Sequence, residues 1–188
     1  MSLYLVSCER WERAYLQGQV IYIGEECYVE TTGLYGETDK IINKIPEKGL
    51  KIYEIEGDTE HNYVEVSGYI LHGLYVKENY KKDESKIEAV CFARDYKKFI
   101  YTEPAIELVK ELLDYRNIIK YDEDELFQLM QQGKGVYLKY ANDYVGECCG
   151  YIVYNGENYM FYNGKEKILS IINEEMKAKL AEYIEIVQ

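Results

Sequence analysis

Alternation of apolar and polar positions dominates the first half of the chain. Residues 50–56 read Leu-Lys-Ile-Tyr-Glu-Ile-Glu, which has the period of two that is typical of a half-buried strand. Short runs rich in β-branched and aromatic residues predict further strands at 3–6, 19–23, 27–32, 63–77 and 87–93. Gly68 and Gly73 interrupt the longest run, so we expect either one bulged strand or two strands there.

A period of three to four residues marks the helices. Thr102 is placed to cap a helix whose apolar stripe is Ile106, Val109, Leu112 and Leu113. A second helix is predicted from its cap Asp122 to Gly133, with four acidic residues in the first turn. Three more are predicted at 9–16, at 38–45 before Pro46, and after Asn173, the last with an apolar face of Met176, Leu180, Tyr183, Ile184 and Val187.

Two strand-like runs, 151–154 and 159–162, flank Asn155-Gly156, which predicts a hairpin with a two-residue type I′ turn. Alternation along both runs leaves each face apolar or amphipathic, whereas a sheet covered on one side shows a polar outer face. Since the predicted helices have narrow stripes, we expect one hairpin face to lie at an interface, most simply in a symmetric homodimer. The residues of this predicted interface are Tyr151, Tyr154, Tyr159 and Tyr162.

These elements indicate an α+β fold, mostly antiparallel sheet with four or five helices, in a single compact domain spanning residues 1–188. Two similar lobes are an alternative. The order helix, Gly, strand, Gly-Glu-x-Cys, strand, helix occurs twice, with the motif at 24–27 and at 146–149. This echo predicts a pseudo-repeat of 1–115 and 122–188, against chance similarity in a Tyr- and Glu-rich chain.

The high tyrosine content of the chain affects the expected character of its surface. The chain has 22 Tyr but only 4 Phe and 1 Trp, and its formal charge is -12. A tyrosine hydroxyl needs a hydrogen-bond partner when it is buried, so half-exposed sheet faces and wet interfaces suit this residue. The negative charge opposes direct binding of nucleic acid or anionic membranes, and it suits a basic protein partner as well as solubility.

The five cysteines are odd in number and no secretory signal pattern precedes Cys8, so free thiols and a cytoplasmic location are expected. No apolar run approaches the roughly 18 residues that a membrane helix needs. Cysteine and histidine spacing lacks any zinc pattern, and no phosphate-binding loop is present. We therefore expect no metal and no cofactor.

Candidate chemistry is limited to two thiols and two imidazoles. Cys148 and Cys149 are adjacent, and either would be a nucleophile if a histidine approached it in the fold. His61 precedes the 63–77 run and His72 lies within it beside Gly73, and pairing of 63–68 with 69–77 would bring both to the same end of a sheet. The structural alternative is that the thiols fill the core and both histidines lie at the surface.

Two functional hypotheses follow. The first is a non-enzymatic cytoplasmic protein-binding module that uses an acidic, tyrosine-rich face, because tyrosine is enriched at protein interfaces. The second is a small hydrolase or transferase that uses Cys148 or Cys149 with His61 or His72. A cleft that holds a thiol beside an imidazole would favour the second hypothesis.

Overall fold

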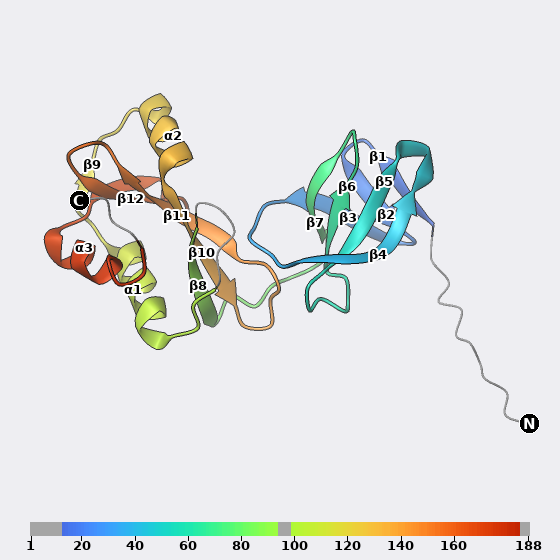
Figure 1. Cartoon of the computed structure of the whole chain (residues 1–188), viewed down its shortest axis with the longest axis horizontal. Helices are drawn as coiled ribbons and strands as arrows, with labels where there is room; N and C mark the ends of the chain where they lie inside the picture. The colour runs from blue at the N-terminus through green and yellow to red at the C-terminus, as the bar shows by residue number, and fades with distance from the viewer. Residues whose placement is uncertain (1–12, 94–98, 185–188) are drawn as a thin grey trace, which may run out of the picture. The chain divides into compact units, whose positions relative to one another are not determined.

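A computed structural model of the chain describes residues 13–93 and 99–184 (Figure 1). Its described residues form two compact units. Unit 1 contains residues 13–32 and 36–80, and unit 2 contains residues 33–35, 81–93 and 99–184. Both units are built on antiparallel sheets, which confirms the predicted α+β class for the chain as a whole.

Unit 1 is a seven-stranded antiparallel sheet in the order β1-β2-β3-β7-β6-β5-β4, curled into a half-barrel so that β1 also contacts β4. Alternate residues of each strand point inward and form a core of aliphatic residues with Tyr28 and Tyr75. The strands are β1 (Ala14–Gln17), β2 (Val20–Ile23), β3 (Glu26–Thr31), β4 (Glu37–Ile45), β5 (Leu50–Ile55), β6 (Tyr63–Ser67) and β7 (His72–Lys77), with a short 3-10 helix at Pro46–Lys48.

Unit 2 is a six-stranded antiparallel sheet in the order β8-β10-β11-β12-β13-β9. Its strands are β8 (Ile87–Ala93), β9 (Ile118–Ile119), β10 (Lys134–Tyr140), β11 (Glu147–Tyr154), β12 (Tyr159–Asn163) and β13 (Ile168–Ile171). The helices are α1 (Glu103–Asp114), α2 (Glu123–Gln132) and α3 (Glu174–Leu180). Helices α1 and α3 pack on one face of the sheet around Phe161, and α2 packs on the other around Val153 (Figure 1).

Three α-helices occur in the described residues, fewer than the four or five predicted. The segment 38–45 is strand rather than helix. Its isoleucines are β-branched and favour strands, and the register shift between residues 41 and 43 lets Ile42 and Ile45 both enter the core. Residues 14–16 of the predicted helix at 9–16 likewise belong to a strand, β1, residue 13 is irregular, and residues 9–12 lie outside the described residues.

The caps of the later helices are largely as predicted. Asp122 accepts hydrogen bonds from the backbone N–H groups of Asp124 and Glu125, and Asn173 accepts one from Met176. Thr102 occupies the N-cap position of α1 without a side-chain cap bond. The last helix is shorter than predicted, although Ile184 beyond its end is still buried, and Val187 lies outside the described residues.

The hairpin at 151–162 is confirmed, but its turn is not the two-residue type I′ turn. Tyr154 pairs with Tyr159, so the loop has four residues, 155–158. The Asn155 side-chain oxygen accepts hydrogen bonds from the N–H groups of Glu157 and Asn158, which favours the longer loop. The 63–77 run likewise forms two strands rather than one bulged strand.

The two units differ in architecture, since the described part of unit 1 has no α-helix and unit 2 has three. Their boundary falls between residues 80 and 81, while residues 115–122 lie inside unit 2 between α1 and α2. Both Gly-Glu-x-Cys segments do begin the second strand of an antiparallel hairpin, β2–β3 and β10–β11. The single domain over 1–188 and the pseudo-repeat of 1–115 and 122–188 stay predictions.

Among the described residues, no helix has both the length and the apolar character that crossing a bilayer requires.

Candidate functional site

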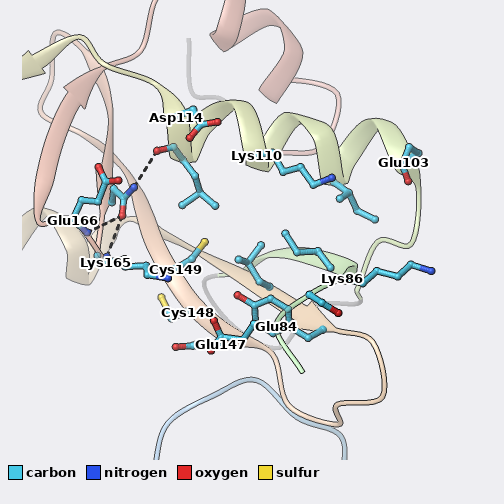
Figure 2. Close-up of a pocket in the computed structure, with 18 residues that line it drawn as sticks. Glu84, Lys86, Glu103, Lys110, Asp114, Glu147, Cys148, Cys149, Lys165 and Glu166 are labelled. Carbon is cyan, nitrogen blue, oxygen red and sulfur yellow. Dashed lines mark hydrogen bonds between the residues drawn. The ribbon is translucent and has the colours of Figure 1, made fainter. Parts of the chain in front are cut away.

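Unit 2 contains a pocket of about 740 Å³, which we call the α1 pocket (Figure 2). It lies between α1, the β10–β11 hairpin, and two connections, 84–87 and 163–166. Its volume falls in the range of roughly 300–1,000 Å³ that is usual for ligand pockets. The pocket belongs entirely to unit 2.

Helix α1 supplies one wall because five of its residues recur at intervals of one, three or four and therefore share a face. These residues are Glu103, Ile106, Lys110, Leu113 and Asp114. Ile106 and Leu113 join Leu138 of β10 and Cys149 of β11 in an apolar floor that continues the unit 2 core.

The 163–166 connection is held against the end of α1. The Asn163 side chain donates a hydrogen bond to the Leu113 carbonyl at 3.1 Å. Its oxygen accepts from the N–H groups of Lys165 and Glu166, each at 3.1 Å, as the dashed lines of Figure 2 show. This buried asparagine fixes two charged residues at the rim.

The rim of the α1 pocket is predominantly acidic. Five carboxylates and three ammonium groups line it, a formal balance of two negative charges: Glu84, Glu103, Asp114, Glu147 and Glu166 against Lys86, Lys110 and Lys165. Several of these charges are already paired, Lys110 with Glu107 and Glu166 with Arg116. Asp114 at the C-terminal end of α1 makes no ion pair with any described residue and faces the unfavourable end of the helix dipole.

Lys82 lies next to the α1 pocket and pairs with two acidic residues of its rim. Its ammonium group pairs with Glu147 and Glu84 and lies 5.4 Å from the centre of the Tyr140 ring. Burial alone would lower the pKa of Lys82, but the hydrogen bond and charge of Glu147, with Glu84, raise it above its ordinary value. Lys82 therefore stays protonated and holds Glu147 in place.

The two predicted cysteines both line the α1 pocket, yet their thiols are held in the protonated form. Burial raises the pKa of Cys149 to about 12 and also raises the pKa of Cys148. Each thiol donates to a backbone carbonyl, Cys149 to Val136 at 3.3 Å and Cys148 to Gly150 at 3.4 Å. As adjacent residues of β11, they extend from opposite faces of the strand.

The two predicted histidines lie in unit 1, so neither unit holds an imidazole together with Cys148 or Cys149. The prediction that both histidines reach the same end of a sheet is wrong. His72 pairs with Ser67 beside the β6–β7 turn, whereas His61 precedes the far end of β6, which spans five residues or roughly 17 Å. His61 instead contacts Glu54 at 3.0 Å, and Lys40 pairs with the same carboxylate.

The four predicted interface tyrosines are spread over two covered faces. Tyr151 and Tyr162 are half-buried beside α2, and Tyr159 is half-buried on the opposite face. Tyr154 is 44% exposed and stacks on Tyr159 with ring centres 4.7 Å apart. The interface was predicted because one hairpin face was expected to lack a covering helix. Helices of the same chain cover both faces, so this reason for the prediction no longer holds. The interface and the homodimer stay predictions that sedimentation at micromolar concentration tests.

Sequence reasoning missed the α1 pocket. The sequence pattern at 102–113 indicated only an apolar stripe, although the spacing of Glu103, Lys110 and Asp114 also places charged residues along one face of α1. Residues 163–166 lie beside α1 because Asn163 bonds to Leu113, which is 50 residues away in the sequence. No local sequence pattern reveals such a contact.

No metal centre is apparent elsewhere, since no group of three or more His, Cys, Asp or Glu in residues 13–93 and 99–184 is arranged to hold an ion. Comparison of the sequence and structure with family models, curated proteins and solved structures gave no match.

Proposed function

We propose that the chain is a non-enzymatic binding module whose α1 pocket receives lysine or arginine side chains of a basic protein partner. The observation that carries this proposal is the combination of an apolar floor with a rim of five carboxylates and three lysines. Lysine and arginine have an aliphatic stem and a cationic head, so the floor suits the stem and the rim suits the head. The formal charge of -12 attracts such a partner over longer distances.

Asp114 strengthens the argument. A carboxylate at the C-terminal end of a helix opposes the helix dipole, typically by 0.3–1 kcal/mol. Helix α1 has no basic residue in its last turn, although Arg116 just beyond it donates a hydrogen bond to the Leu113 carbonyl at 2.7 Å and offsets part of this effect. A cation bound at the rim beside Asp114 would add to this compensation.

The alternative, a Cys/His-dependent hydrolase or transferase, has less support. A nucleophilic cysteine needs a thiolate at working pH, whereas burial raises the pKa of both pocket thiols. No described residue of unit 2 is a histidine that would take the proton. Iodoacetamide labelling at pH 8 tests this point, because an activated Cys149 would react faster in the native protein than in urea, and we expect the reverse.

A synthetic peptide of alternating lysine and leucine, titrated calorimetrically, tests the proposed function. We expect saturable binding that weakens at least fivefold between 50 and 300 mM NaCl, because salt screens the rim charges. The double variant Glu103→Gln/Asp114→Asn should weaken binding by a similar factor at low salt. The matched control Glu157→Gln/Glu25→Gln removes the same charge at exposed turns and should bind like the wild type. Equal affinity of both double variants would refute the proposal.

The cytoplasmic location, and the expected lack of nucleic-acid and membrane partners, belong to the same proposal. They are supported by the chain's acidity and by the free thiols of Cys27, Cys91, Cys148 and Cys149. A partner protein with a basic surface is compatible with the acidity of the chain.

A further inference from the structure

Glu65, in the middle of β6, is a buried acidic residue whose carboxylate makes no ion pair with any described residue. Only 8% of the residue is exposed, and among the described residues it makes no hydrogen bond or ion pair. Its neighbours on β6, Val64 and Val66, point into the unit 1 core, so Glu65 faces the opposite side of the sheet. Buried charged residues are almost always paired, which makes this one unusual.

Glu65 lines a pocket of about 360 Å³ in unit 1, which we call the Glu65 pocket. One wall is an irregular part of β4. Glu37 pairs with Ile55, and Ile41 pairs with Tyr53. Between these pairs β4 advances by four residues while β5 advances by two, so residues 38–40 form a bulge. The bulge is fixed where the Thr38 hydroxyl donates to the Glu54 carbonyl at 2.8 Å and Lys40 pairs with the Glu54 carboxylate at 2.6 Å.

Every side chain that lines the Glu65 pocket carries an oxygen acceptor, and none is a cation. Three are carboxylates and three are hydroxyls: Glu37, Asp39, Glu65, Thr38, Tyr53 and Ser67. Burial, and then the charge of Glu37, raise the pKa of Glu65, while His72 opposes the shift. A pocket that gathers acceptors around an unpaired acid is complementary to a hydrogen-bonding cation.

We propose that the Glu65 pocket binds an organic cation with N–H donors, a guanidinium or primary ammonium group. Such a group donates three to five hydrogen bonds, which matches the ring of acceptors. The carboxylates of the pocket are not arranged as a metal site, since no group of three or more His, Cys, Asp or Glu among residues 13–93 and 99–184 could hold a metal ion. The site is separate from the α1 pocket in unit 2 and does not depend on the function proposed there.

Titration of the full-length chain with small cations, followed by amide NMR shifts, tests the proposal. Methylguanidinium and methylammonium should give saturable shifts at residues 37–39, 53 and 65–67. Tetramethylammonium and sodium at equal ionic strength should not, because they lack N–H donors. An acetylated Gly-Arg-Gly amide distinguishes the two sources of the cation: tighter binding than methylguanidinium indicates a protein side chain, and weaker binding indicates a free small molecule.

Glu65→Gln keeps the shape of the side chain and removes its charge, so it should raise the dissociation constant of the better cation about tenfold or more. Glu25→Gln removes the same charge at an exposed turn of unit 1 and should have no effect. Three results would overturn the inference: no saturable shift, equal binding of tetramethylammonium, or unchanged binding by Glu65→Gln. None of them bears on the peptide titration of the α1 pocket.

Discussion

Two buried polar residues of unit 1 lower the stability of the folded state. Tyr75 is fully buried in the unit 1 core, yet its hydroxyl has no hydrogen-bond partner among the described residues. Glu65 is a buried acid that makes no ion pair with any described residue. Such groups destabilise the folded state, and proteins commonly retain them where they serve binding.

Tyr75→Phe should stabilise the protein by about 1 kcal/mol, because it removes an unsatisfied buried hydroxyl and preserves the ring. Urea denaturation measures the change in the free energy of unfolding. Tyr28→Phe is the matched control, since the Tyr28 hydroxyl donates to the His61 carbonyl at 2.8 Å and its loss should destabilise. A less stable Tyr75→Phe variant would mean that the hydroxyl has a partner after all.

Glu65→Gln should stabilise the protein at pH 7 by on the order of 1 kcal/mol, because it removes an unpaired buried charge. The pKa of Glu65 is raised by burial, so the folded state binds more protons than the unfolded state above about pH 4.3. Wild-type stability therefore falls as the pH rises through this window, and the advantage of the variant grows.

Denaturation at pH 4 and pH 7 checks this linkage. The difference between Glu65→Gln and the wild type should nearly vanish at pH 4, where both side chains are neutral. A constant difference at both pH values would show that lost repulsion or packing, rather than titration of Glu65, is responsible.

At the scale of elements, local signals succeeded where one residue controls the backbone. Asp122 and Asn173 cap their helices as predicted, and the hairpin at 151–162 forms. Segment 38–45 was mispredicted because isoleucines three and four residues apart fit either a helix stripe or a bulged strand. Only its pairing with β5 decides between them, and pairing is a tertiary property.

The candidate sites were less accessible from sequence than the elements. Cys148 and Cys149 do line the α1 pocket, but their protonated state follows from burial that no spacing reveals. Glu65 looks like an ordinary outward-facing strand residue in Tyr-Val-Glu-Val-Ser. It lines a pocket together with Glu37 and Asp39 of β4, whose irregular register no local pattern reveals.

Close strand pairing at Gly150 gives a prediction for unit 2. A Cβ atom there would lie 2.2 Å from the Tyr162 carbonyl oxygen and 2.8 Å from the Phe161 ring. Gly150→Ala should therefore push β11 from β12 and cost about 1–3 kcal/mol of stability. Gly164→Ala is the control, because its Cβ would have ordinary contacts of 3.5 Å or more. Equal thermal midpoints for the two variants would contradict the register of this sheet.

At the scale of the whole molecule, the charge of -12 should itself lower stability through repulsion among the acidic residues. Raising NaCl from 20 to 200 mM shortens the screening length to below about 10 Å. We expect the melting temperature to rise by a few degrees, a shift that corresponds to about 1 kcal/mol. A fall instead would mean that ion pairs such as Lys179 with Glu111 outweigh the net repulsion.

The path of the chain between the units has a consequence for the order of folding. Residues 33–35 belong to unit 2, although unit 1 contains the residues on both sides of them. Leu34 exchanges two backbone hydrogen bonds of 2.8 Å with Gly146, which is 112 residues later (146 minus 34).

During synthesis at about 5–20 residues per second, Gly146 follows Leu34 by roughly 6 to 22 s. Residues 14–77 of unit 1 are complete well before then, so its strands can pair around a segment whose own partner does not yet exist. In the nascent chain, the backbone of Leu34 therefore lacks its partner for several seconds after the strands of unit 1 have been synthesised. The segment 33–35, which lies between two parts of unit 1 in the sequence, is thus one that a chaperone can bind during this interval.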